Sequence, residues 1–279
     1  MTPSFVTVTD PDDPRIAAYR DIRERDLVGR RGEFIAEGEV VLRVLLGPAA
    51  RHRAVSLLVA EKRVSRLGPL FEGLDPAVPV YAAGQAVMDA IAGFPMHRGI
   101  LAHGVRAPER TAEDVLNAAL PRALALGLFG IANHDNMGGL FRNAAAFGVD
   151  AVLLDDTCCD PLYRKSIRVS VGAALTVPFA RLPTGQDPLA LLTRTGFTAL
   201  ALSPNGDEPL AGLSRPDRVA VLLGAEGAGL PDELLQRART AAIPMARGWD
   251  SLNVASASAV VLHELTRDGP RRASPEVDG

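Results

Sequence analysis

The chain has 279 residues, enough for one large domain or two ordinary ones, and 47% of them are hydrophobic. Its formal net charge of −3 excludes a general attraction to nucleic acid or membrane, so a polyanionic partner would have to meet a local basic patch. The N-terminal stretch lacks the basic region and apolar core of a signal peptide, and no run approaches the roughly 20 apolar residues of a membrane span. These features predict a soluble cytoplasmic protein.

The cysteine content argues against a disulfide-stabilised or metal-binding fold. The two cysteines, Cys158 and Cys159, are adjacent and fit neither a metal-ligand nor a disulfide spacing. We interpret them as small, partly buried residues after a strand, in a reducing compartment. No metal is expected.

Strands and helices alternate with short connections in the first hundred residues, which predicts a small α/β domain over residues 1–106. Short apolar runs predict its strands, at residues 33–37, 54–60, 78–81 and 98–102. Helical composition predicts its helices, at residues 15–27, 38–46, 64–71 and 85–92. A proline among charged residues at 106–110 ends the pattern.

Arginines are frequent in this first domain, and two interpretations of them are open. They could form a phosphate-binding surface for RNA. Alternatively, they belong to a solvated charged helix, because acidic residues at 21, 24 and 26 interleave with them and exposed charge is the ordinary case. The arginines concerned are Arg15, Arg20, Arg23, Arg25, Arg30, Arg31, Arg51 and Arg53. His97, Arg98 and Gly99 are either a further contact point or merely structural.

A second domain is expected over residues 107–268, followed by a polar, disordered tail at 269–279. Helical composition at 112–124 leads into a buried apolar run at 126–132. The remaining strands are predicted at 151–154, 176–180, 197–202, 218–223 and 241–244. The remaining helices are predicted at 189–195 and 254–265, with one more ending at 169–173 and another starting at Pro231.

The stretch from Asn133 to Asp156 predicts an active site. It is a polar loop, a helical segment and a second strand, and in such units ligands bind where the loop leaves the carboxyl end of the first strand. The loop holds two asparagines, a histidine and an aspartate, where a plain connector needs only a turn. Arg142 follows among apolar neighbours that are expected to pack. An arginine in that position needs an anionic or hydroxyl-bearing partner.

A second candidate loop, Gly224 to Gly229, follows the strand at 218–223. Its three glycines let the backbone approach a ligand closely. The order GAEGAG is not a dinucleotide-binding GxGxxG, because the carboxylate of Glu226 would repel a pyrophosphate. The loop suits a ligand with hydroxyls, an amine or a sulfonium; the alternative is a tight turn with an exposed Glu226.

A third candidate loop, residues 245–253, precedes the last helix. Ser251 is a candidate cap for that helix. The helix begins with the small residues Ala255 to Ala259, which allow another backbone or an aromatic ring to lie close.

These three loops resemble motifs one, two and three of the SpoU (TrmH) family of RNA 2′-O-ribose methyltransferases, within the SPOUT superfamily. The segments that carry the resemblance are NHDNMGGLFRNAAAFGVD, LLGAEGAGLP and IPMARGWDSLNVASASAVVLHE, in that order. The resemblance covers about residues 112–265 in detail. EFIAEGEVV and HRGILA in the first domain are similar to the ribosomal-protein-like RNA-binding domain that many members carry.

The resemblance implies a specific fold and cofactor. The C-terminal domain would be an α/β knot, a trefoil-knotted parallel sheet, behind a smaller N-terminal α/β domain that binds RNA. The cofactor would be S-adenosylmethionine, and Gly224, Ile243 and Leu252 match the family's cofactor positions. Members act as homodimers, with the site at the subunit interface.

The resemblance also implies roles for single residues. Arg142 would activate or orient the ribose 2′-hydroxyl; because a guanidinium is a poor base, binding the phosphate and stabilising the developing alkoxide suits it better. Asn136 matches the motif-one asparagine. Glu226 and Asn253 would hold Arg142 and the loops in register, and Ser251 would cap a helix and contact substrate. Alignment and desolvation would supply most of the rate of the in-line methyl transfer, with no metal.

The chain departs from the family pattern at two places. His134 and Asp135 stand where a proline usually follows the first asparagine, and Ala225 replaces the asparagine of Gly-Asn-Glu. Arg142, Glu226, Ser251 and Asn253 all follow the family pattern, so activity is expected. The changed loop is expected to affect which RNA is accepted.

The leading prediction is therefore an S-adenosylmethionine-dependent RNA 2′-O-methyltransferase acting on rRNA or tRNA. An alternative is a non-catalytic RNA-binding or ribosome-assembly protein that retains the knot. A Rossmann-type oxidoreductase is disfavoured by the loop sequence and by the missing acidic ribose partner. The sequence does not name the target nucleotide.

Overall fold

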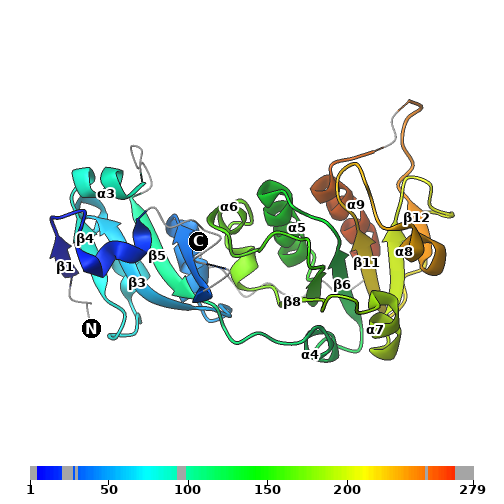
Figure 1. The fold of residues 1–279 in the computed structure, drawn as a ribbon, viewed down its shortest axis with the longest axis horizontal. Coiled ribbons are helices and arrows are strands. Elements are labelled where there is room, and N and C mark those ends of the chain that lie inside the picture. The colour runs from blue at the N-terminus through cyan, green and yellow to red at the C-terminus, as the bar shows by residue number, and fades with distance from the viewer. Residues whose placement is uncertain (1–4, 21–27, 29–30, 93–98, 249–250, 268–279) are drawn as a thin grey trace. The chain divides into compact units, whose positions relative to one another are not determined.

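The computed structural model describes residues 5–20, 28, 31–92, 99–248 and 251–267, in two compact units (Figure 1). The first unit comprises Met1–Pro108 together with Asp160–Thr176, and the second comprises Glu109–Cys159 and Val177–Gly279. Residues 160–176, which the sequence suggests are part of the second domain, therefore belong to the first unit.

Two ion pairs hold this segment in the first unit. The buried carboxylate of Glu37 accepts a hydrogen bond from Arg164, with the charged groups 2.9 Å apart, and Arg106 pairs with Asp160. A carboxylate that is only 5% exposed is costly to bury without such a partner. The contact between Arg164 and Glu37 joins residues 127 positions apart, so no local sequence pattern predicts it.

The first unit is built on a five-stranded mixed sheet. Its strands, in spatial order, are β1 (Phe5–Val8), β4 (Val80–Ala83), β3 (Arg53–Ala60), β5 (Ile100–Val105) and β2 (Glu33–Glu37). β1, β4 and β3 are parallel, whereas β5 is antiparallel to both of its neighbours. The helices are η1 (Pro14–Tyr19), α2 (Glu39–Leu46), η3 (Glu61–Arg63), η4 (Gly68–Phe71), α3 (Gln85–Ala92), α6 (Arg164–Val169) and η5 (Ala173–Leu175). Tyr19, Leu58, Met88 and Leu101 are among the residues of its core.

Several sequence predictions for this unit need correction. Residues 64–71 do not form one helix; the 3₁₀ turn η3 ends before them at Arg63, and only the 3₁₀ turn η4 lies among them, because Pro69 cannot donate a backbone hydrogen bond. The helix expected at 15–27 is a 3₁₀ turn that ends at Tyr19, and residues 21–27 lie outside the described part. His97 and Arg98 lie outside it too, as do Arg23, Arg25 and Arg30.

The second unit is built on a seven-stranded sheet in which every pair of neighbours is parallel. Its strands, in spatial order, are β10 (Glu208–Pro209), β12 (Arg239–Ala242), β9 (Thr198–Leu202), β11 (Arg218–Leu223), β6 (Ala123–Leu128), β7 (Ala151–Leu154) and β8 (Phe179–Arg181). The helices are α4 (Ala112–Asn117), α5 (His134–Ala146), α7 (Pro188–Arg194), α8 (Asp232–Arg237) and α9 (Val254–Thr266).

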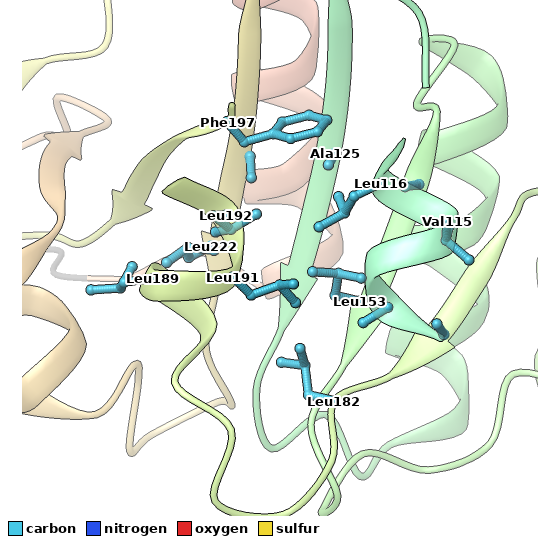
Figure 2. Packing of buried hydrophobic residues seen from close by; sticks show 14 of the residues in the cluster. Val115, Leu116, Ala125, Leu153, Leu182, Leu189, Leu191, Leu192, Phe197 and Leu222 are labelled. Atoms are coloured by element: carbon cyan, nitrogen blue, oxygen red, sulfur yellow. The ribbon is translucent and has the colours of Figure 1, made fainter. Parts of the chain in front are cut away.

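Helices cover both faces of this sheet, so its central strands are apolar throughout. Alternate residues of the strands, such as Ala125, Leu153 and Leu222, join a core with α4 and α7 (Figure 2). The intervening residues, such as Leu126 and Val221, are equally buried and face the opposite side. In Figure 1, α5 and α9 lie on that opposite side.

The element boundaries in this unit shift for local reasons. The helix expected at 112–124 ends at Asn117, because the apolar residues from Ala123 on are buried on both faces of the sheet as β6. The strand expected at 126–132 ends at Leu128, and Gly130 turns the chain with a φ of +70°. The strand expected at 176–180 begins only after Pro178.

Candidate active site

The first loop of the candidate site is a helix start held by a half-buried carboxylate. Asp155, after β7, accepts hydrogen bonds from the backbone N–H groups of Gly130 at 3.0 Å and Cys158 at 2.8 Å. Cys158 in turn accepts one from the N–H of Ile131, and burial raises the pKa of its thiol to about 12. The thiol is therefore a neutral structural group, and it keeps the chain ahead of α5 in one conformation.

The polar residues predicted to form a loop are the first turn of α5. Asn133 is the N-cap, since its side-chain oxygen accepts from the backbone N–H groups of Asp135 and Asn136. His134, Asp135 and Asn136 are already helical. Asn136 is 8% exposed, so its amide is fixed at the carboxyl end of β6.

The second loop closes on its own backbone. Ala225 and Gly229 bridge across the turn, with the N–H of Gly229 donating to the carbonyl of Ala225 at 2.9 Å. A Cβ on Gly224 would overlap the backbone of Gly229. Gly224 is therefore glycine because its own loop approaches it, not because a ligand does. Glu226 is exposed at the tip.

Asn253 joins the three loops. Its side-chain Nδ2 donates to Asn136 Oδ1 and to Glu226 Oε1, each at 2.9 Å. Its Oδ1 accepts from the N–H groups of Ala255 and Ser256 and so caps α9. The cap of α9 is thus Asn253, and the expectation that Ser251 caps it is wrong; Ser251 is exposed ahead of the helix. The side-chain amide of Asn253 therefore caps the helix with its oxygen and binds the other two loops with its nitrogen.

Arg142 projects away from this network. It lies six residues, or about 240°, around α5 from Asn136, and it is exposed. Among the described residues no hydrogen bond or ion pair links it to Glu226 or Asn253, in contrast to the expectation that they hold it. Ala145, which the sequence predicts to pack, is also exposed on this helix, whereas Leu140 and Phe141 are fully buried.

The remaining two candidate residues lie beside apolar surface. Ile243 and Pro244 line a cavity of about 370 Å³ together with residues of α9 and of the 210–211 segment. Leu252 is 46% exposed, directly before the Asn253 cap. The described part of the chain holds no group of three or more His, Cys, Asp or Glu side chains that could bind a metal ion. Within it, too, no helix has the length and apolar character needed to cross a membrane.

Sequence reasoning missed the contact between α5 and α9. Asn143 donates from Nδ2 to the carbonyl of Ala255 at 2.7 Å and to Ser258 Oγ at 2.8 Å, and Ser258 is fully buried. A Cβ added to Gly139 would lie 2.8 Å from the Cβ of Ala255. The small residues at the start of α9 were the available signal, and they do let a second helix approach.

Comparison with known proteins identifies the family. A model described as the SpoU rRNA methylase family matches residues 123–263. An uncharacterized tRNA/rRNA methyltransferase from Mycobacterium tuberculosis is 40% identical over 274 residues, covering 94% of this chain and 92% of that protein. The chain belongs to the SpoU family of RNA methyltransferases. A methyltransferase of the same description from Synechocystis is 26% identical over 279 residues, covering 99% of this chain and 98% of that protein.

Solved structures of RNA methyltransferases share the fold over nearly the whole chain. An rRNA methyltransferase from Sinorhizobium meliloti with bound AdoMet (S-adenosylmethionine) has a TM-score of 0.78 at 23% identity, covering 94% of this chain and 98% of that one. An RNA 2′-O ribose methyltransferase has a TM-score of 0.76 at 26% identity, with the same coverage. The first likeness concerns the fold alone, an α/β arrangement with a parallel sheet.

Proposed function

We propose that this SpoU-family protein transfers a methyl group from S-adenosylmethionine to a ribose 2′-hydroxyl of rRNA or tRNA. The observation that carries the proposal is the amide of Asn253, which joins Asn136 of motif one to Glu226 of motif two while capping the motif-three helix. Three loops from β6, β11 and β12 thereby form one site at the carboxyl ends of a parallel sheet, where ligands bind in open α/β folds. The likeness to an RNA 2′-O ribose methyltransferase supports the ribose as target.

The residues present fit S-adenosylmethionine. The loop after Gly224 carries a carboxylate, which suits a sulfonium cation and opposes a pyrophosphate. Ile243, which lines the cavity of about 370 Å³ beside His263 and Glu264, and the exposed Leu252 both offer apolar surface for an uncharged ring. Bound there, S-adenosylmethionine supplies an activated methyl group. Gly224, Ile243 and Leu252 are the residues proposed to hold it.

The proposed role of Arg142 follows from its chemistry. A guanidinium stays protonated at neutral pH and presents several N–H donors, so it binds a phosphate and stabilises charge developing on the 2′-oxygen better than it removes a proton. Its exposure leaves those donors open to RNA. Asn136, Glu226 and Asn253 fix the loops, and Ser251 is proposed to contact substrate.

The proposal includes a homodimer through the second unit, folded as an α/β knot. Val260 on α9 is 43% exposed and Leu252 is 46% exposed, and both are large apolar side chains. They lie on, or directly before, the helix that packs on α5, and a second copy that covers them would bury this apolar surface. We propose that the first domain, residues 1–106, binds the RNA. Arg15 and Arg20 pair with Asp13 and Asp12, which disfavours those two as contacts.

The test is methyl transfer by the purified chain. We expect label from tritiated S-adenosylmethionine to reach unmodified rRNA or tRNA at a ribose, mapped by alkaline resistance of the neighbouring phosphodiester. Transfer to neither RNA would refute the proposal. Arg142→Ala should abolish transfer while calorimetry shows cofactor binding nearly unchanged; equal loss of both would assign Arg142 a different role.

The second candidate, a non-catalytic RNA-binding protein, makes the opposite prediction. Calorimetry would then show RNA binding without cofactor binding. The polar network of Asn136, Glu226 and Asn253 favours the enzyme, because an idle site has no need of a connected set of partly exposed polar side chains.

A further inference from the structure

A stripe along one side of α5 contacts α9. Asn136, Gly139 and Asn143 of α5 and its C-cap residue Phe147 recur at spacings of three and four residues, which places them along one side of the helix. Each has a partner at α9: the cap residue Asn253 for Asn136, Ala255 for Gly139, and the ring of His263, 6.3 Å away edge-on, for Phe147. We call this face, residues 136, 139, 143 and 147, the α5 seam.

Asn143 makes the directional contact at the middle of the seam. Both hydrogens of its Nδ2 are used, one toward the carbonyl of Ala255 and one toward Ser258 Oγ. Ser258 also donates to that carbonyl at 2.7 Å, so the three groups close a triangle. A hydrogen bond weakens steeply when its length or angle changes, whereas apolar contacts tolerate sliding. The triangle therefore fixes α5 along and around α9.

Gly139 sets the separation of the two helices. Because even one methyl group would lie 2.8 Å from Ala255 Cβ, the backbones approach at the limit that two small residues allow. The amide of Asn143 reaches a backbone carbonyl of α9 only at this separation. Separation and register are thus set by neighbouring residues on the same face.

The position of Arg142 depends on the α5 seam. It directly precedes Asn143 and lies about 100° around the helix from it, on the exposed side. The seam ends at Asn136, which binds Asn253 and through it Glu226. The packing of α5 on α9 therefore helps to set where the guanidinium lies relative to the loops of motifs two and three.

We propose that Asn143 is a positioning residue for methyl transfer, which acts by holding Arg142 in register with the loops of motifs two and three. The proposal rests on the proposed function, since it needs the reaction in which Arg142 acts. Asn143 itself points into the protein, away from the side on which RNA would contact Arg142.

The test compares Asn143→Ala with a core variant of similar stability in the same unit. Val115→Ala on α4 removes buried surface at the sheet face opposite α5 (Figure 2). A displacement of about 1 Å at a reacting group costs up to roughly 100-fold in rate. We expect Asn143→Ala to lower kcat about 10- to 100-fold with the KM for S-adenosylmethionine nearly unchanged, and Val115→Ala to leave kcat unchanged.

A second comparison asks whether Asn143 acts through Arg142. In an Arg142→Lys background the guanidinium is absent, so adding Asn143→Ala should lower single-turnover transfer by less than about 2-fold. Ser258→Ala, which removes one corner of the triangle, should show the same dependence on Arg142.

The outcomes separate two failures. Wild-type protein that transfers no methyl group to RNA would refute the proposed function itself. Active wild-type protein with an Asn143→Ala variant of unchanged kcat would overturn the positioning role alone. Equal rate losses from Asn143→Ala in the wild-type and Arg142→Lys backgrounds would show that Asn143 does not act through the guanidinium.

Discussion

Replacing Asn253 by aspartate isolates the connection of motif three to motifs one and two. An aspartate caps a helix as well as an asparagine does, so the bonds to the N–H groups of Ala255 and Ser256 are kept. The group that changes is Nδ2, which donates to Asn136 and Glu226 at 2.9 Å. In the variant an oxygen takes its place, and two carboxylates face each other across the site.

The size of the effect follows from distance and exposure. Two unit charges about 3 Å apart repel by about 1.4 kcal/mol in water and about 5.5 kcal/mol at an effective dielectric constant of 20. Because Glu226 and Asn253 are both exposed and Glu226 can turn toward water, the lower value applies, and the two lost hydrogen bonds add at most about 1 kcal/mol each. We expect Asn253→Asp to destabilise the second unit by about 1–3 kcal/mol at pH 7.

The sign of the pH dependence is fixed by the same geometry. A proton on either carboxyl removes the repulsion and restores a donor, so the folded variant binds protons more tightly than its unfolded chain. Its stability relative to wild type should therefore rise as pH falls from 7 toward 4.

A four-member cycle with Glu226→Gln tests the reasoning by urea unfolding and cofactor calorimetry. The amide introduced by Glu226→Gln can still accept from Asn253, and it can donate to the carboxylate introduced by Asn253→Asp. In the Glu226→Gln background the cost of Asn253→Asp should therefore fall to about that of the lost bond to Asn136. Asn253→Ala loses the helix cap as well as the two Nδ2 hydrogen bonds. The lost cap should lower the free energy of unfolding by about 1 kcal/mol beyond the effect of those two bonds, and the loss should not depend on pH in this way. An Asn253→Asp cost that is the same with and without Glu226→Gln would refute the account.

Three further predictions concern other parts of the chain. Gly139→Ala gains about 1 kcal/mol of helix propensity, but its new Cβ would lie 2.8 Å from Ala255 Cβ, and relieving that contact costs about 1–3 kcal/mol. We therefore expect a net loss of stability in urea and a larger loss of methyl transfer. A variant that is more stable than wild type and fully active would contradict the role of the α5 seam. Gly224→Ala overlaps the backbone of Gly229, so cofactor affinity should fall at least about 10-fold by calorimetry, and unchanged affinity would show that the loop is free to open. The pKa of His52 is lowered to about 4, first by burial and then by the nearby Arg106, so the first unit should lose stability as pH falls from about 6.5 to 4, and unfolding of His52→Gln should lack this slope.

Much of the local structure followed from the sequence. The strands β2, β7 and β11 and the helix α3 have the predicted bounds, because each is a short run whose burial pattern and breakers are complete within itself. The positions of the three loops after β6, β11 and β12 followed from the same alternation of strand and helix. Their residue types alone indicated a site for a ligand that is not a dinucleotide.

Boundaries failed where a competing local effect decided the structure. Residues 112–124 have helical composition throughout, yet Ala123 and Leu124 belong to β6. A strand of a parallel sheet is apolar on both faces, so its sequence does not show the alternation of apolar and polar residues that would mark it as a strand. The first turn of α5 is polar enough to suggest a loop, but it is helical because Asn133 rather than a later residue is the cap.

What only the tertiary structure decided is which residues meet. The sequence by itself determined the family, the loops and the polar residues in them, since these are properties of short segments. It did not determine that Asn253 rather than Arg142 joins Asn136 to Glu226, or that Asn143 binds α9, because these contacts span 27 to 117 residues. Nor did it place residues 160–176 in the first unit. A hydrogen bond between distant segments depends on how whole helices and sheets pack, and that packing is a property of the folded chain.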